Sequence, residues 1–403
     1  MKTITDQNKI QELLTKGVER IYPDKESLEQ VLLSGKRLRL YCGYDPTSAH
    51  LHLGNAISLR KLAQFQALGH EVIMLLGDFT AMIGDPTDKS AARQKLSREQ
   101  VNNNLKNYQT QASKILQFDG DNPVKIRRNS EWHDQMTFKD LIEITANFTV
   151  GQMIDREMFQ QRIKDAKPIY LHEFLYPVAQ AYDSVAMDVD LEVGGNDQTF
   201  NMLCGRDLMS ALKNKEKFVL TMKLLTDASG KKMGKTEGNT ANLDEASNEM
   251  FGKIMSWSDE MIVPGFELCT GVPCEQLEEI KSELAGQEVN PRDLKARLAF
   301  EIVKQFYNLD VAQRAQEQFD QVFSQKQAPD EIEIIKLGQA QMQLAEILIV
   351  TGLAKSKSDA KRLVEQKSIK VNNETVDDWQ AMIDIKNETL IQKGKRFFVK
   401  VES

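Results

Sequence analysis

Short apolar runs alternate with longer helical patterns from about residue 37 to residue 226 of the chain. A bounded apolar run of roughly four to eight residues suits a buried strand, whereas apolar residues about one turn apart line one face of a helix. Strands that alternate with helices predict an α/β fold with a parallel sheet. We expect strands at 38–42, 71–76, 124–126, 191–193 and 218–220, and helices at 55–68 and from about residue 197.

The remaining parts of the chain differ in pattern from this region. Residues 1–35 predict amphipathic helix, and residues 244–324 lose the strand signal and predict helices only. The polar, proline-bearing stretch 325–330 suits a linker. The predicted organisation is a Rossmann-like parallel-sheet domain at 1–243, an all-helical domain at 244–324, a linker at 325–341 and a small α+β domain at 342–403.

The distribution of charge limits the kinds of partner. The chain has 403 residues and a formal net charge of −7, so it lacks the strongly basic field of a nucleic-acid coat protein. The last 62 residues hold 11 Lys and Arg against nine Asp and Glu, whereas the preceding 341 hold 41 against 50. The only net basic region is therefore the C-terminal one, and a polyanion could bind there.

The sequence shows no sign of export or membrane insertion. No basic segment leads into an apolar stretch near the N-terminus, and the longest apolar run, at 72–76, has five residues where a membrane span needs about 20. The four cysteines form no CxxC pair and no zinc-ligand spacing. We therefore expect a cytoplasmic protein with no membrane segment, no disulfide framework and no tightly bound metal site.

The sharpest local motif spans residues 41–55, where a predicted strand ends at Cys42 and a helix begins near Gly54. A helix N-terminus presents free N–H groups and the positive end of the helix dipole, so it can hold a phosphate. Gly54 lets a nucleotide lie close to the backbone. His52 and Asn55 can donate to a phosphate oxygen that gains charge in a transition state. Taken alone, a histidine that caps a helix explains the motif equally well.

A second motif is the glycine-punctuated basic loop at 229–236, Ser-Gly-Lys-Lys-Met-Gly-Lys-Thr. Lys232 and Lys235 stand three residues apart, and a flexible loop of this kind can wrap a triphosphate and follow it as it departs. The spacing of a P-loop is missing. In isolation, a solvated basic loop explains the motif as well.

Together these two motifs resemble the signatures of class I aminoacyl-tRNA synthetases. His-Leu-Gly-Asn at 52–55 is similar to HIGH, and Lys-Met-Gly-Lys-Thr at 232–236 is similar to KMSKS, in family order and about 180 residues apart. Asn55, Gly234 and Thr236 depart from the signatures. Asparagine still donates a hydrogen bond and threonine keeps the hydroxyl, so the chemistry is retained.

Further blocks narrow the resemblance to tyrosyl-tRNA synthetases of bacterial type, which carry a C-terminal RNA-binding module. Asn196 replaces the usual Ser or Thr, and Thr199 stands where many relatives carry Trp, which suggests a divergent branch. The joint match is much more specific than any single block. The family's strand-and-turn, GDP, YxxxQAYD and GG[ST]DQ blocks have counterparts at 41–47, 84–89, 176–183 and 194–198.

The resemblance implies a tyrosine pocket, and the residue chemistry agrees with it. Asp183 and Tyr41 are expected to read the phenol, because a carboxylate accepts from its hydroxyl and a tyrosine hydroxyl donates to it. Tyr176, Gln180 and Asp183 share one face of a helix. Together with Asp85, Tyr176 and Gln180 would hold the substrate ammonium. Phenylalanine would be rejected, because it leaves buried polar groups unpaired.

The resemblance also implies an ATP site, with Mg²⁺ accompanying the nucleotide. Gly195 and Asp197 would lie at the ribose, with Cys42 nearby and Gly54 against the nucleotide, and Gln198 would lie between ribose and tyrosine. The residues expected to neutralise the departing pyrophosphate are Thr47, Lys89, Arg93, Lys232 and Lys235.

The C-terminal region would supply the RNA contact. Residues 344–353 and 358–366 predict two short helices, and 368–373 predict a strand that enters a turn. This pattern resembles a small RNA-binding fold shared with a ribosomal protein, although a solvated helix face is the plain alternative. RNA affinity should fall with salt. The basic residues expected to meet phosphates are Lys355, Lys357, Lys361, Arg362, Lys367 and Lys370.

The resulting hypothesis is a tyrosine–tRNA ligase that binds L-tyrosine, ATP and tRNA(Tyr) and acts as a homodimer, the last being implied only by the resemblance. One alternative is an enzyme of the same fold that activates tryptophan. This alternative is disfavoured by Asp183, Tyr41 and the basic C-terminal region. Another is an RNA-binding protein that has lost catalysis, which predicts damaged catalytic blocks. Those blocks are intact, because His52, Asp197 and Lys235 are all present.

Overall fold

The structure is a computed structural model that describes most of the 403 residues. Two compact units make up the chain, residues 1–312 and residues 313–403, and the division falls inside helix α17 (Leu309–Ser324). The described residues are 2–87, 96–227, 233, 241–286, 289–324, 334–385, 389–394 and 397–403, without the side chains of 322–324.

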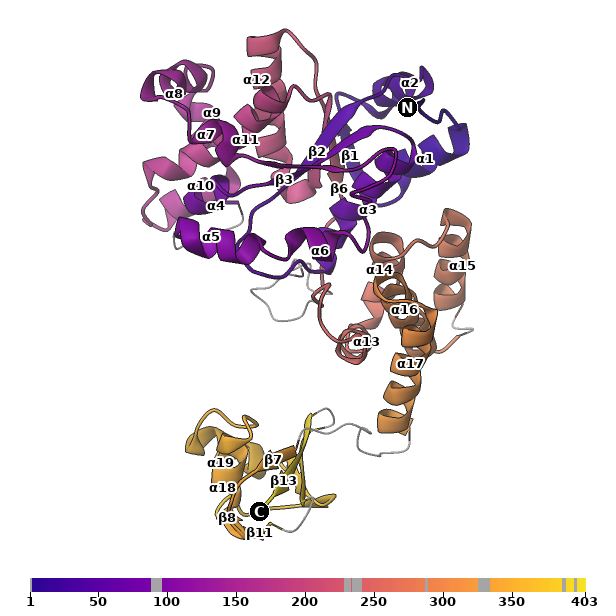
Figure 1. Ribbon diagram of the computed structural model, residues 1–403, viewed down its shortest axis with the longest axis vertical. Helices are drawn as coiled ribbons and strands as arrows, with labels where there is room; N and C mark the ends of the chain where they lie inside the picture. The colour runs from indigo at the N-terminus through magenta and orange to yellow at the C-terminus, as the bar shows by residue number, and fades with distance from the viewer. Residues whose placement is uncertain are drawn as a thin grey trace. The chain divides into compact units, whose positions relative to one another are not determined.

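A six-stranded sheet forms the centre of the first unit, with strand order β1-β6-β5-β2-β3-β4 (Figure 1). Every neighbouring pair from β6 to β4 is parallel, whereas β1 joins the edge antiparallel to β6. This confirms the predicted α/β fold and each predicted strand. The strands are β1 (Val18–Tyr22), β2 (Arg39–Tyr44), β3 (Glu71–Leu76), β4 (Lys125–Arg128), β5 (Leu191–Gly195) and β6 (Phe218–Met222).

The N-terminal region differs from the prediction of helix alone. Helix α1 (Gln7–Thr15) is followed by strand β1, and only then by helix α2 (Lys25–Leu33). Gly17 ends the first helix with a φ of +66°, a conformation that glycine adopts without steric cost. β1 is an edge strand in which only Ile21 is buried, so its short pattern carries little hydrophobic signal.

The helices of this unit cover the sheet. Helix α3 (Leu53–Ala67) packs on β2, β3 and β5, and α12 (Thr199–Lys213) packs on β5, β6 and the long helix α11 (Leu171–Met187). Gly205 on α12 leaves room for side chains from neighbouring elements, because a Cβ there would lie 2.5 Å from Lys217 Nζ and 2.9 Å from Ser184 Oγ on α11. The shorter helices are α4 (Thr80–Ile83), α5 (Arg98–Leu105), α6 (Tyr108–Ala112), α7 (Ser130–His133), α8 (Phe138–Thr145), α9 (Val150–Ile154) and α10 (Glu157–Lys164).

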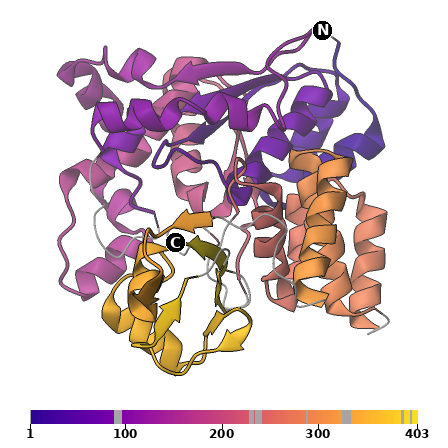
Figure 2. The same ribbon diagram turned by 60° about the horizontal axis from the view of Figure 1, so that its bottom comes forward.

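Residues 244–312 are helical, as the loss of the strand signal predicts. Helix α16 packs against α13 and α14 (Figures 1 and 2). The contact with α14 is close because Gly265 has no side chain; a Cβ there would lie 2.6 Å from Leu298. The helices of this segment are α13 (Ser247–Met255), α14 (Ile262–Cys269), α15 (Cys274–Ala285) and α16 (Pro291–Phe306).

Basic side chains from the sheet domain cap helix ends. Lys61 on α3 is buried and donates to the carbonyl oxygens of Leu13 and Lys16 at the end of α1. Its neighbour Arg60 donates to the carbonyl of Cys269 at the end of α14. The last carbonyls of a helix lack partners within the helix and form the negative end of its dipole. These contacts therefore stabilise the attachment of α1 and of the helical segment to α3.

The second unit is a small α+β module. Its strand order is β10-β9-β12-β13-β7, and a separate β8–β11 pair lies beside it. Asn372 and Asn373 both have positive φ and form the turn from β9 to β10, which confirms the predicted strand and turn. The elements are β7 (Ile334–Lys336), β8 (Gln341–Gln343), α18 (Leu344–Val350), α19 (Lys357–Glu365), β9 (Ile369–Val371), β10 (Glu374–Thr375), β11 (Met382–Asp384), β12 (Thr389–Lys393) and β13 (Phe397–Glu402).

Strand β7 lies inside the range expected to be a linker, 325–341. It pairs in parallel with β13, and Leu337 donates its N–H to the carbonyl of Glu402, so residues 334–337 belong to the folded module. The run Ile-Ile between charged residues is too short to predict a strand alone, since its pairing partner lies more than 60 residues away along the chain.

The structure also bears on membrane segments and on cysteine pairing. Among the residues that the structure covers, no helix is long and apolar enough to cross a membrane. All four cysteines are free; Cys42, Cys204 and Cys269 are buried and Cys274 is exposed.

Candidate active site

A cavity of about 290 Å³ opens where β2, β3, β5 and β6 end, the edge of a parallel sheet at which ligands bind in α/β folds. Most of the predicted site residues line it. Lys89, Arg93, Lys232 and Lys235 lie outside the described residues. The predicted residues on the cavity wall are Tyr41, Cys42, Thr47, His52, Gly54, Asn55, Asp85, Tyr176, Gln180, Asp183, Gly195, Asp197 and Gln198.

The first motif forms the start of α3. The side-chain oxygen of Asn55 accepts from the backbone N–H of His52 at 3.0 Å, which fixes the helix entry. That oxygen is thus occupied, and only the amide nitrogen of Asn55 can donate to a ligand. Gly54 lies beneath the imidazole, because a Cβ there would be 2.9 Å from His52 Cε1. The absence of a side chain at Gly54 therefore allows the imidazole of His52 to pack against it.

The chain that follows the second motif, at residues 241–243, is joined to the first motif by main-chain hydrogen bonds. His52 and Asn242 form an antiparallel bridge, and the N–H of Leu243 donates to the carbonyl of Leu51 at 2.8 Å. Met233, in the middle of the second motif, is buried and lines the cavity. The structure thus brings part of each motif to one cavity, although about 180 residues separate them in the sequence.

Asp183 lies at the buried end of the cavity and accepts three hydrogen bonds. Trp132 Nε1 and His133 Nε2 lie 2.8 Å from its Oδ1, and Asn129 Nδ2 lies 3.3 Å from Oδ2. Burial raises the pKa of Asp183, and the three partners oppose that shift. Sequence reasoning missed Asn129, Trp132 and His133. Their position directly after a predicted parallel strand was the one available signal.

Tyr41 is fully buried, but its hydroxyl contacts Ser184 at 2.9 Å, not Asp183. The expected pair therefore lines the same cavity without forming a direct hydrogen bond. Burial, together with the charges of Glu192 and Asp183, raises the pKa of Tyr41 well above its usual value. The group is consequently a neutral phenol that can both donate and accept.

The residues expected at the substrate ammonium have other partners in this structure. Asp85 accepts from Gln198 Nε2 at 2.8 Å, and Tyr176 donates to Asp45 Oδ2 at 2.8 Å. Gln180 donates to Glu192 at 2.9 Å. The cavity thus holds five carboxylates, those of Asp45, Asp85, Asp183, Glu192 and Asp197, of which Asp45 and Glu192 were not predicted. Asp45 stands inside the block at 41–47, and Glu192 is a lone acid within an apolar strand.

The glycines at the end of β5 form another part of the cavity wall. Gly194 and Gly195 end β5, and a Cβ on Gly195 would lie 2.5 Å from Asp197 Oδ1. Cys42 lies on the same wall, where burial raises the pKa of its thiol to about 11. The thiol is therefore protonated at neutral pH and suits a packing or weak donor role, not a nucleophilic one.

The basic residues of the second unit differ in how they are paired. Five of the six predicted RNA contacts are exposed and Lys370 is half-buried. Lys357, Lys361 and Arg362 face Glu346, Glu365 and Asp359 across N–O distances of 3.5, 3.8 and 2.6 Å. Exposed pairs of this kind contribute little stability, so they leave these cations available to a polyanion.

Comparison with known proteins identifies the family. Residues 33–324 match the family model of class I tRNA synthetases for tryptophan and tyrosine, and residues 324–401 match the C-terminal domain of tyrosine–tRNA ligases. The chain is 40% identical over 390 residues to the tyrosine–tRNA ligase of Thermotoga maritima, with 96% of each chain covered. It is 42% identical over 402 residues to that of Carboxydothermus hydrogenoformans, with 97% of each covered. The chain belongs to the tyrosine–tRNA ligase family.

Solved structures show the same fold at lower identity. A tyrosyl-tRNA synthetase from Archaeoglobus fulgidus, complexed with L-tyrosine, aligns with a TM-score of 0.60 and 21% identity over 77% of this chain and all of that one. A truncated mitochondrial enzyme from Aspergillus nidulans aligns with a TM-score of 0.64 and 20% identity over 78% and 94%. These structures confirm the predicted fold.

Membership of the tyrosine–tRNA ligase family also bears on the tryptophan alternative. The catalytic family model covers both tryptophan and tyrosine enzymes and does not separate them. The curated relatives, matched over nearly the full length, carry the tyrosine name, and the C-terminal domain is that of tyrosine–tRNA ligases. The family therefore favours tyrosine.

Proposed function

We propose that this chain activates L-tyrosine with ATP and transfers it to the 3′ end of tRNA(Tyr). The observation that supports this function is the single cavity with two unlike ends. One end carries the buried Asp183 and Tyr41, and the other is formed by the N-terminus of α3 with His52 and Asn55. An amino acid and a nucleotide held at these ends would meet inside one cavity.

Tyrosine would enter with its ring between the strand ends and α11. Asp183 would accept from the phenolic hydroxyl, since one of its oxygens is only weakly engaged, by Asn129 at 3.3 Å. Asp85, Tyr176 and Gln180 would surround the ammonium, with Gln198 between tyrosine and ribose. Phenylalanine has no hydroxyl to bond with Asp183 and Tyr41, so each would lose the hydrogen bond that tyrosine adds in this buried site, at a cost of about 1–3 kcal/mol for each polar group.

Activation is a displacement at phosphorus. A carboxylate oxygen of tyrosine attacks the α-phosphate of ATP, the bond to the bridging oxygen of the β-phosphate breaks, and pyrophosphate leaves. The amide N–H of Asn55, His52 and Thr47 would donate to oxygens that gain charge, with Lys89, Arg93, Lys232 and Lys235 and the Mg²⁺ of the nucleotide neutralising the phosphates. The chain's part is positioning and charge stabilisation.

Transfer to tRNA completes the proposal. The 3′-terminal ribose hydroxyl attacks the adenylate carbonyl, and AMP leaves. In this scheme residues 1–243 bind tyrosine and ATP, residues 244–324 lie on the anticodon side, and the C-terminal module, which begins no later than β7, contacts RNA through its basic residues. We also propose a cytoplasmic location, where the tRNA substrate is found.

A homodimer is the proposed assembly. Large apolar side chains are exposed on α8, α9 and the start of α11, namely Phe138, Ile142, Val150 and Leu171, of which Phe138 is 78% and Leu171 is 83% exposed. α8 and α9 lie at one side of the first unit (Figure 1). Large apolar side chains that are exposed close together mark protein interfaces, and we propose that these four lie in the dimer interface. Sedimentation should give a dimer for the native chain and a monomer for Phe138→Glu; a native monomer refutes this part.

The deciding experiment is ATP–pyrophosphate exchange across amino acids. We expect exchange driven by tyrosine and not by tryptophan or phenylalanine, and loss of tyrosine-driven exchange in Asp183→Ala. Asp165→Ala is the matched control, because it removes an exposed carboxylate that pairs with Lys167 outside the cavity. Exchange driven by tryptophan would overturn the specificity. A folded chain that shows no exchange with any amino acid would instead support the non-catalytic RNA-binding alternative.

A further inference from the structure

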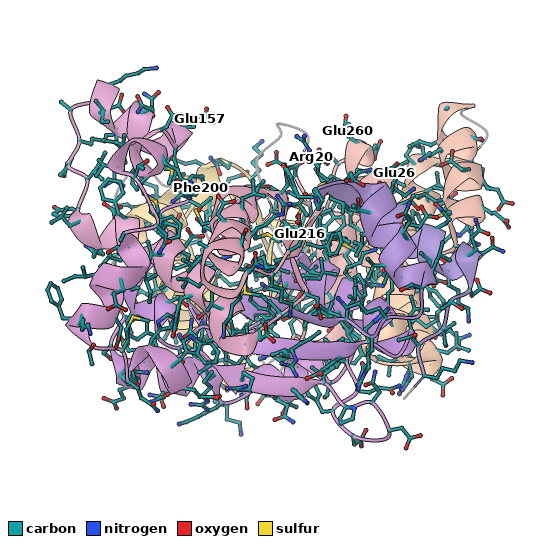
Figure 3. All side chains as sticks on the ribbon, turned by 90° about the horizontal axis from the view of Figure 1, so that it is seen from above. Arg20, Glu26, Glu157, Phe200, Glu216 and Glu260 are labelled. Atoms are coloured by element: carbon teal, nitrogen blue, oxygen red, sulfur yellow. The ribbon has the colours of Figure 1, made fainter. Side chains whose placement is uncertain are left out.

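A buried ion pair lies behind the tyrosine end of the cavity. Lys217 directly precedes β6 and is fully buried, and its ammonium contacts Glu192 on β5 and lies 2.9 Å from the hydroxyl of Ser184 on α11. Its neighbour Glu216 is labelled beside α12 in Figure 3. None of Lys217, Glu192 and Ser184 was singled out by the sequence motifs.

Burying this ion pair in the core is energetically unfavourable compared with burying apolar side chains. Removing two charges from water usually costs more than their attraction returns, and well-packed apolar residues would serve stability as well or better. Space is also kept for the ammonium. A Cβ on Gly205 of α12 would lie 2.5 Å from Lys217 Nζ and 2.9 Å from Ser184 Oγ. The sequence thus keeps both the charges and the room for them directly behind the cavity.

The ammonium sets the direction of the neighbouring hydrogen bonds. It carries only donors, so Ser184 Oγ must accept from Lys217. The single proton of Ser184 then has two acceptors within reach, Tyr41 at 2.9 Å and Glu192 Oε2 at 3.5 Å. The shorter contact is the stronger hydrogen bond. Ser184 can thus donate to Tyr41 while it accepts from Lys217, and the proton of Tyr41 is then available to Glu192 or to a ligand in the cavity.

We infer that Lys217 is a positioning residue for tyrosine recognition, which acts through Ser184 to make the hydroxyl of Tyr41 a donor to the phenolic oxygen of the substrate. This inference rests on the proposed function. Asp183 accepts the phenolic proton, so the phenolic oxygen has to receive a hydrogen bond from its other neighbour. A chain of donors thus runs from Lys217 through Ser184 and Tyr41 to the substrate and ends at Asp183.

Glu192 has the balancing role. Its Oε1 accepts from Gln180 at 2.9 Å on the cavity side, while its Oε2 is engaged by Lys217 on the far side. The charge of Glu192 is therefore balanced by Lys217, and Asp45 and Asp85 would face the substrate ammonium.

The test uses two variants that break the chain of donors in different ways. Lys217→Met combined with Glu192→Gln removes both charges, so no unpaired charge is left in the core. Ser184→Ala removes the intermediate hydroxyl and keeps the ion pair. Lys61→Met is the control, because Lys61 is another buried lysine that donates only to backbone carbonyls away from the cavity.

Exchange kinetics with tyrosine and with 4-aminophenylalanine provide the readout. The aniline group donates to Asp183 but is a poor acceptor, so the native chain should prefer tyrosine. In both Lys217→Met/Glu192→Gln and Ser184→Ala, Tyr41 can turn and accept from the aniline. The preference for tyrosine should then fall about tenfold, which corresponds to ~1.4 kcal/mol. The KM for ATP should stay unchanged, and Lys61→Met should keep the native preference.

The inference is overturned if both variants keep the native preference, or if Lys61→Met lowers it equally. Thermal unfolding of each variant shows whether the substitution destabilises the fold. A destabilised variant would lose activity with tyrosine and 4-aminophenylalanine equally, so the preference between them would not change. Failure of the proposed function is a separate result: the native chain would then show no exchange with tyrosine at all.

Discussion

Replacing Gly54 with alanine should slow tyrosine activation without unfolding the chain. The new Cβ would lie 2.9 Å from His52 Cε1 and 3.0 Å from Nδ1. Carbon atoms in contact normally lie about 3.5–4.0 Å apart, so the imidazole has to move by at least ~0.5 Å. A misplacement of about 1 Å can cost ~100-fold in rate. Half of that displacement suggests a loss of about tenfold in kcat, or ~1.4 kcal/mol of activation free energy.

The assay is ATP–pyrophosphate exchange with tyrosine, together with thermal unfolding. The KM for tyrosine should stay near the native value, because Asp183 and Tyr41 are untouched. Gly252→Ala on α13 is the matched control: it is also a helical glycine, but a Cβ there meets nothing within 4 Å. Its kcat should be native, and alanine should stabilise the helix by up to about 1 kcal/mol. A folded Gly54→Ala chain with native kcat would refute the role assigned to the position of His52.

Three further predictions concern stability and RNA binding. Burial lowers the pKa of Lys61 from 10.5 to about 7, so between these values the unfolded chain holds a proton that the folded chain lacks. The free energy of unfolding should then rise by up to about 1.4 kcal/mol per pH unit, and Lys61→Met should remove that slope in denaturant titrations. Arg162→Met should cost about 3–5 kcal/mol in the same titrations, because it leaves the buried carboxylate of Glu173 unpaired; native stability would contradict this. Lys355→Ala, which removes an exposed cation, should lower the salt slope of tRNA binding by about one, and an unchanged slope would place Lys355 outside the RNA contact.

Much of the fold could be predicted because the sheet is buried. Strand β3 is a continuous apolar run with five of its six residues buried, which is the signal that a central parallel strand leaves in a sequence. Strands β1 and β7 were missed for the opposite reason. Both lie at sheet edges, are short and mostly not buried, and depend on partners far away along the chain. Local pattern carries no information on such pairing.

The active site also has parts that the sequence predicts and parts that it does not. Asp183, Tyr41 and His52 could be placed from motifs, because their blocks are local. Their supporting groups could not, since Lys217 and Ser184 become neighbours only when α11 and β6 pack together. A lysine before a strand and a serine within a helix carry no individual signal. Only Glu192, an acid inside an apolar strand, departed from its local pattern enough to have been noticed.

The bridge between His52 and Asn242 affects which substitutions the first motif can tolerate. The hydrogen bonds that hold residues 51 and 53 to residues 243 and 241 run from backbone to backbone, so they do not depend on which side chains are present. A substitution on either strand of the bridge changes its chemistry without moving the main chain. Leu53→Ile combined with Asn55→His, which creates HIGH at 52–55, removes the hydrogen bond from His52 N–H to Asn55 Oδ1 but should leave the backbone hydrogen bonds to residues 241 and 243 in place.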